Sequence, residues 1–195
     1  MWIVGWCSIC MCSLYQPFMA IWMKGNSNMM LSFLNMLLFC IYFYVINMTY
    51  ARSMYLDGYG LFYECRVWFV VEAIGNLIMN IALGYFMGIT GILLATIITI
   101  VIFNFICRTN VLFKHYFKMK PNSFYGQHAY YLFVTIIAGS ITYLLNSIID
   151  IPGYAGLFVR LLICLIVPNG LYLIFYFRLT LFKGAKDMMK RVIKL

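Results

Sequence analysis

The sequence predicts an all-α, polytopic integral membrane protein, with a bundle of six transmembrane helices and an amphipathic C-terminal helix. Composition supports this fold class, because 65% of the 195 residues are hydrophobic and only 10% are charged. Six apolar segments are long enough for the about 20 helical residues that cross a bilayer. They lie at about residues 2–23, 29–51, 64–87, 89–107, 129–149 and 156–177. Residues 1–178 would form one transmembrane lobe, and residues 179–195 a basic tail.

The positions of Lys and Arg predict the orientation of these helices. If the N-terminus is cytoplasmic, only Lys24 and Arg160 of the 14 Lys and Arg residues fall on the outer side. Positively charged loops are retained in the cytoplasm, so both termini are expected there. This topology accounts for the net charge of +9, so nucleic acid is not an expected partner.

Polar residues inside the second segment are candidates for an internal surface. Asn35 and Tyr42 lie well within residues 29–51, where a polar side chain is costly against lipid. Both are therefore candidates for a substrate cavity. Residues 52–63 contain an Asp and two Gly, and predict a cytoplasmic turn.

The third segment carries the strongest functional signal. Glu72, Asn76 and Asn80 fall on one side of a helix with a period of 3.6 residues. An unpaired charge near the bilayer centre costs about 3 kcal/mol, so this polar stripe should face a bundle interior or water. Two roles remain open for Glu72: it lines a cavity and takes up protons, or it pairs with another group to hold the bundle together.

Small residues predict close packing between the third and fourth segments. Gly84, Gly88, Gly91 and Ala95 have the spacing that allows two helices to approach closely. After this hairpin, residues 109–127 become polar and basic, and their Pro and Gly residues predict a loop.

Arg160 is the second charged residue inside an apolar segment. It lies about one turn into the sixth segment, where its long side chain can reach the outer surface. Alternatively, it lines a cavity and meets an anionic group such as phosphate. The tail is predicted to bind anionic membrane lipids through a basic face. That face contains Lys183, Lys186, Lys190, Arg191 and Lys194.

No catalytic, metal or cofactor site is expected. Cys7, Cys10 and Cys12 cluster, but they lie in an apolar helix without a nearby His, and the other four cysteines are scattered. The five acidic residues are dispersed and both His lie in one predicted loop. The sequence therefore does not favour a membrane enzyme of polysaccharide assembly, which needs such groups together at one membrane face.

Several short motifs carry a family resemblance. They are EAIGN at 72–76, NIAL at 80–83, GITG at 88–91 and LAT at 94–96, together with Pro17, Phe18 and IWMKG at 21–25. With the helix count, orientation and basic tail, they resemble the C-terminal half of Wzx-type polysaccharide (O-antigen) flippases. These belong to the multidrug/oligosaccharidyl-lipid/polysaccharide exporter superfamily.

The resemblance implies a transporter of the bacterial cytoplasmic (inner) membrane. Such proteins flip polyprenyl-diphosphate-linked oligosaccharides to the outer leaflet, for O-antigen or capsule synthesis, by alternating access of two six-helix lobes. The chain would be one lobe, acting with a missing N-terminal lobe or a partner chain. The resemblance implies that Glu72, Asn76 and Asn80 line the inter-lobe cavity and that Arg160 faces the diphosphate. Two alternatives stay open: a non-transporting membrane subunit or remnant, and a drug exporter of the same superfamily.

Overall fold

The computed structural model describes residues 1–23 and 30–177, and every regular element in these ranges is a helix. Five helices are uninterrupted: α1 (Trp2–Trp22), α2 (Phe33–Gly58), α3 (Phe62–Met87), α6 (Asn122–Ser147) and α7 (Gly153–Tyr176). The remaining one is continuous in four parts: α4 (Ile89–Thr99), the π-helical η2 (Ile100–Cys107), α5 (Arg108–Leu112) and the π-helical η3 (Phe113–Phe117).

The predicted fold class is confirmed, because the described chain is all-helical and six helices are long and apolar enough to cross a membrane. The predicted amphipathic tail, with Lys183, Lys186, Lys190, Arg191 and Lys194, lies outside the described residues.

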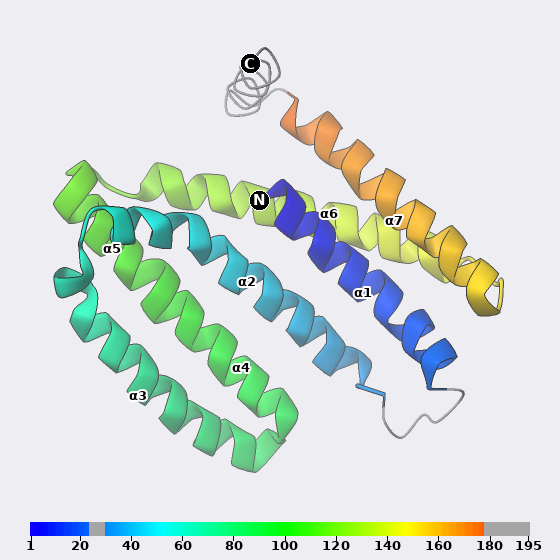
Figure 1. The fold of residues 1–195 in the computed structure, drawn as a ribbon, viewed down its shortest axis with the longest axis horizontal. Helices are drawn as coiled ribbons and strands as arrows, with labels where there is room; N and C mark the ends of the chain where they lie inside the picture. Colours follow the sequence, from blue (N-terminus) through cyan, green and yellow to red (C-terminus); the bar gives the residue numbers. More distant parts are fainter. Residues whose placement is uncertain (24–29, 178–195) are drawn as a thin grey trace.

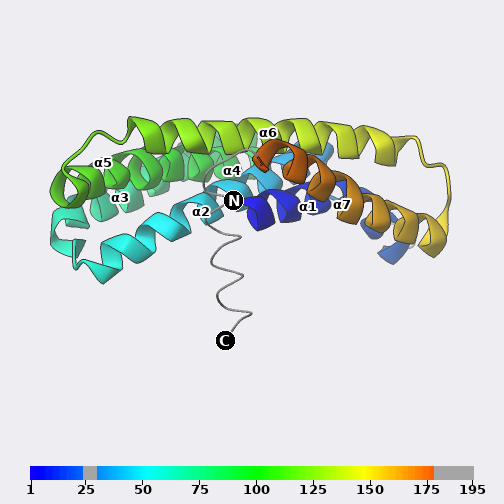
Figure 2. The ribbon, with the colours of Figure 1, turned by 90° about the horizontal axis from the view of Figure 1, so that it is seen from above.

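The helices pack in a row that begins with the α3–α4 hairpin. α4 contacts α2, α2 contacts α1, and α1 contacts α7 (Figure 1). α6 packs on α1 and α7, and runs along one side of the molecule over its whole length (Figure 2). α3 packs mainly on the continuous helix that begins with α4, shares a small buried cluster with Leu56 of α2, and lies at one edge of the row.

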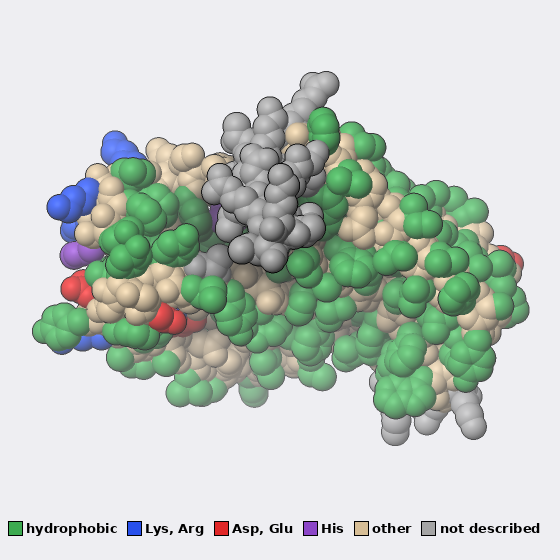
Figure 3. Space-filling view, turned by 45° about the horizontal axis from the view of Figure 1, so that its top comes forward, with side chains coloured by type: hydrophobic (Ala, Val, Ile, Leu, Met, Phe, Trp, Pro, Cys, Tyr) green, Lys and Arg blue, Asp and Glu red, His purple; other side chains and the backbone are tan. Residues whose placement is uncertain are grey.

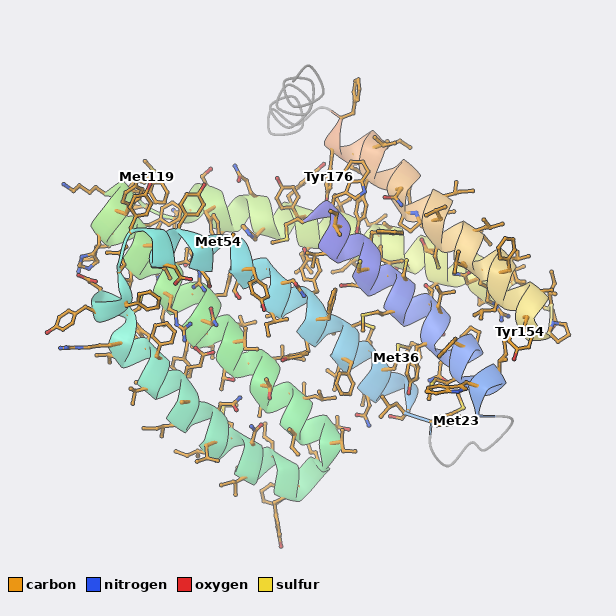
Figure 4. All side chains as sticks on the ribbon, viewed as in Figure 1. Met23, Met36, Met54, Met119, Tyr154 and Tyr176 are labelled. Carbon is orange, nitrogen blue, oxygen red and sulfur yellow. The ribbon has the colours of Figure 1, made fainter. Side chains whose placement is uncertain are left out.

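Charge distinguishes the two ends of the bundle. Met54 and Met119 lie at one end, and Met23 and Tyr154 at the opposite end (Figure 4). The end with Met54 and Met119 carries the Lys and Arg side chains visible in Figure 3, and we call it the basic end. Arg160, near the start of α7, belongs to the opposite end.

The helices at the basic end are longer than the sequence predicted. The bounds of the expected turn at residues 52–63 are wrong, because α2 continues to Gly58 and the turn is confined to residues 59–61 before α3. Hydropathy marks the part of a helix that crosses hydrocarbon, whereas backbone hydrogen bonding continues beyond it. Arg52 is an example, because its side chain is 2% exposed and packs inside the bundle, so residue 52 belongs to α2 and not to a turn.

The predicted loop at residues 109–127 is also wrong. The fourth helix continues to Phe117, and α6 begins at Asn122, which leaves residues 118–121 as the link. Thr109 is fully buried, so this part of the helix packs against its neighbours. Lys118 has φ of 52° and ends this helix, whereas Gly126, which was expected in the loop, lies within α6.

Buried side chains form small clusters between helices, and most large hydrophobic side chains point outward. Ile9, Val134 and Tyr172 join α1, α6 and α7. Tyr44 and Phe105 join α2 to η2. In α3 only Cys65 is buried, and the visible surface is largely hydrophobic (Figure 3). An apolar exterior around a thin interior suits a chain surrounded by lipid.

Candidate functional site

The polar stripe of α3 faces α4. Asn80 Nδ2 donates to Asn76 Oδ1 at 2.8 Å, and Asn76 Nδ2 donates to Thr99 Oγ1 at 2.9 Å. Thr99 in turn donates to the Ala95 carbonyl on its own helix at 2.9 Å. The Asn76–Thr99 bond therefore crosses the α3–α4 interface, where such hydrogen bonds hold membrane helices together, whereas the Asn80–Asn76 bond lies within α3.

Small residues bring the same two helices close together. A Cβ atom added at Gly91 would lie 2.0 Å from the Leu83 carbonyl oxygen, so only glycine fits there. Ala95 is fully buried, and Gly84 lies against the Ile92 side chain. Gly88 has φ of 59° and forms the turn between α3 and α4.

The interface hydrogen bonds give a first prediction. Replacing Thr99 by Val is expected to destabilise the folded chain by about 1 kcal/mol, because Asn76 loses its partner across the interface. Thr96→Val is the matched control, since the exposed Thr96 hydroxyl bonds only to the Ile92 carbonyl of its own helix. Thermal unfolding in detergent measures both, and equal melting temperatures would show that the inter-helix bond contributes nothing.

Glu72 belongs to a charged network that joins four elements. Its Oε2 accepts a hydrogen bond from Arg108 Nη2 of α5, and the two side chains form an ion pair. Asn104 of η2 donates to Glu72 Oε1 at 3.5 Å. Arg52 of α2 donates to both the backbone carbonyl and the side-chain Oδ1 of Asn104. We call Arg52, Glu72, Asn104 and Arg108 the charged network.

Both arginines of the charged network are buried, and the network carries an excess of positive charge. Arg52 is 2% exposed and Arg108 is 6% exposed. Arg108 also stacks on the Phe69 ring, with its guanidinium carbon 3.7 Å from the ring centroid. Glu72 is the only carboxylate paired with either arginine among the described residues. The Nε atoms of both arginines lack a hydrogen-bond partner there, so one guanidinium charge stays without a counter-ion.

Sequence reasoning identified Glu72 but missed its partners. Arg52 and Arg108 were interpreted as loop charges that set the topology, and the structure places both inside the bundle. One signal was available: Asn104 and Arg108 are four residues apart, and so share a helix face.

The charged network lies at an irregular part of the fourth helix. Asn104 belongs to η2, which is π-helical over Ile100–Cys107, and Arg108 follows it directly. π-Helical turns within α-helices are rare, and those that occur are often found at functional sites. Two residues of the charged network therefore lie in or next to the π-helical segment.

Asn35 and Tyr42 are separate from the charged network. Asn35 Oδ1 accepts a hydrogen bond from Thr90 Oγ1 at 2.7 Å, which links α2 to α4 near the end opposite the basic end. Tyr42 is half-buried on α2 and lines neither of the two cavities described next.

Arg160 of α7 lies beside the C-terminal end of α6 and lines a polar cavity. Its Nη2 donates to the Ile149 carbonyl at 2.7 Å and its Nε to the Asn146 carbonyl at 3.4 Å. Asn146 lies in the last turn of α6 and Ile149 just past its end, so the cation stabilises the helix C-terminus. The cavity has a volume of about 270 Å³ between α1, α6 and α7. Ser13, Gln16 and Asn146 are among its other polar residues.

A second cavity adjoins the first and is mostly apolar. It has a volume of about 390 Å³ between α1, α2 and α6, and its walls include Ile9, Leu37 and Ile136. Cys12 and Tyr143 line both cavities. The predicted cavity residues thus fall into four places: Glu72, Asn76 and Asn80 along α3, Asn35 bonded to Thr90, Tyr42 on α2 away from both cavities, and Arg160 at the polar cavity.

The described residues hold no cluster of three or more His, Cys, Asp or Glu side chains, and all seven cysteines are free thiols. Comparison with known proteins gives no match to a family model, to a curated protein or to a solved structure.

Proposed function

We propose that the chain is one lobe of a transporter that moves a polyprenyl-diphosphate-linked oligosaccharide across the bacterial cytoplasmic membrane. The observation that carries this proposal is the charged network, which places two buried arginines at a π-helical segment inside a six-helix lobe. Ionisable residues inside a membrane are rare, and commonly mark the path of a substrate or ion.

The charge of the network suits an anionic substrate. Arg52 and Arg108 carry two positive charges and Glu72 carries one negative charge, so the network is net positive. A guanidinium binds phosphate oxygens through paired hydrogen bonds. The basic end would face the cytoplasm by the positive-inside rule, where a diphosphate-linked lipid is loaded.

The position of the network suits a moving element. A π-helical segment gives a helix a place to change register, and such shifts accompany switching between two states. α3, which carries Glu72, packs mainly on this helix, and its outer side chains are largely exposed and apolar. Transport by alternating access also needs a second lobe, supplied by a partner chain or by a second copy of this chain.

Transport can be tested with a fluorescent polyprenyl-diphosphate disaccharide. The tagged chain is purified from its native membrane together with any associated chain and reconstituted into vesicles. A membrane-impermeant quencher then measures how fast the label changes leaflet. We expect faster exchange than in protein-free vesicles, and at least about a tenfold loss when Glu72 and Arg108 are both replaced by Gln.

Thr96→Val is the control, because the Thr96 hydroxyl bonds only within its own helix and lies outside the network. Exchange at the protein-free rate would contradict the proposal and favour a non-transporting subunit. Movement of a cationic dye in place of the labelled lipid would favour a drug exporter.

A further inference from the structure

The two adjoining cavities form one site with a polar part and an apolar part. The polar cavity of about 270 Å³ and the apolar cavity of about 390 Å³ share Cys12 and Tyr143. Ligand sites in proteins commonly have a mostly apolar wall with a few polar groups that fix orientation. The combined shape suits an amphipathic molecule, with its polar group beside Arg160 and its hydrocarbon between α1, α2 and α6.

The polar cavity offers both a cation and an unused acceptor. Arg160 donates to two backbone carbonyls and forms no ion pair with any carboxylate among the described residues. Asn146 is 5% exposed and lines the same cavity. Its Nδ2 donates to Cys164 Sγ at 3.2 Å, whereas its Oδ1 has no hydrogen-bond partner. A ligand that satisfies both residues carries a negative charge for Arg160 and a hydroxyl donor for Asn146.

The order of the two cavities along the helices gives the direction of the ligand. On α1 the apolar cavity is lined from Ser8 to Cys12, and the polar cavity from Cys12 to Pro17. On α6 the apolar wall extends from Leu132 to Tyr143, and the polar wall continues to Ser147 at the helix end. The polar group therefore lies at the end of the bundle opposite the basic end, and the hydrocarbon points toward the middle.

We propose that this site binds a phospholipid with a glycerol headgroup from the leaflet at that end of the bundle. Its phosphate would pair with Arg160, its glycerol hydroxyl would donate to Asn146 Oδ1, and one acyl chain would fill the apolar cavity. This orientation is the one that a phospholipid has in its own leaflet. The inference does not depend on transport, because it concerns a resident lipid and not the moved substrate.

Lipid binding can be measured by native mass spectrometry of the purified chain with defined lipids. Phosphatidylglycerol is expected to bind in a single copy at least about tenfold more tightly than phosphatidylcholine, which has no hydroxyl donor and no net charge. Arg160→Gln should weaken phosphatidylglycerol binding by about tenfold. Arg66→Gln is the matched control, since Arg66 is exposed and stacks on Tyr63 at the basic end.

A second variant tests the apolar part without touching Arg160. Ser140 is exposed and lines the apolar cavity, so Ser140→Phe should fill the cavity and weaken phosphatidylglycerol binding while the chain stays folded. If Arg160→Gln prevents folding, this variant and the lipid preference of the wild-type chain still decide the proposal. Equal binding of the two phospholipids would overturn it. Displacement of phosphatidylglycerol by an equimolar polyprenyl phosphate would also overturn it, and would assign the site to the transported lipid.

Discussion

Replacing Glu72 by Gln is expected to lower the free energy of unfolding by about 3 kcal/mol, because it leaves the buried Arg108 without the carboxylate of their partly buried ion pair. Arg108 would keep its position beneath α3 without a counter-ion, and Arg52 lies in the same network. Thermal unfolding in detergent can be followed with a thiol-reactive dye, since Cys65 and Cys164 are buried and become reactive on unfolding.

Two further variants separate loss of the ion pair from loss of a carboxylate. Glu64→Gln changes an exposed carboxylate in the first turn of the same helix, and should lower the melting temperature much less, because only the interaction of Glu64 with the helix dipole is lost. The double variant Glu72→Gln/Arg108→Gln removes both charges and should recover most of the lost stability. If Glu72→Gln melts at the same temperature as Glu64→Gln, the ion pair does not hold the bundle together.

This result bears on the two roles that the sequence left open for Glu72. Helical periodicity placed Glu72, Asn76 and Asn80 on one face, and the structure turns that face toward the fourth helix. The sequence could not supply the partner, because Arg108 lies 36 residues away and its position depends on how the hairpin closes. A paired Glu72 and a substrate path remain compatible if the π-helical segment changes register during transport.

The lengths of the helices show a second limit of sequence reasoning. Hydropathy predicted the six spans, because a long apolar segment in lipid must satisfy its backbone hydrogen bonds internally and therefore forms a helix. It did not predict that α2 continues to Gly58 or that the fourth helix continues to Phe117. Buried Arg52 and Thr109 extend these helices through packing against neighbours, and that contribution has no signature in local composition.

The site at Arg160 was still harder to predict, because it is formed by tertiary packing. Sequence position allowed a surface cation or a cavity-lining cation, and the structure shows Arg160 bonded to the end of α6 while it lines the polar cavity. The sequence did not predict Asn146 as a site residue. Its importance comes from an unpaired buried oxygen, which exists only because α1, α6 and α7 meet around it.

The α3–α4 hairpin gives the last prediction. Replacing Gly91 by Ala is expected to destabilise the folded chain by about 3 kcal/mol, because the added Cβ would meet the Leu83 backbone carbonyl, which cannot move without displacing α3. Thermal unfolding measures the loss. Crosslinking of cysteines introduced at Gly84 and Ile92, whose residues lie against each other, measures whether the hairpin opens.

Gly126→Ala is the matched control for this substitution. Gly126 also lies within a helix, has no atom within 4 Å of an added Cβ, and shows no positive φ. Alanine there should raise stability by about 0.5–1 kcal/mol, since it lowers the conformational entropy of the unfolded chain. The two variants make the same chemical change, so opposite shifts in melting temperature isolate the close approach of α3 and α4. A stabilising effect of Gly91→Ala would contradict the close approach, and with it the geometry that places Glu72 beside Arg108.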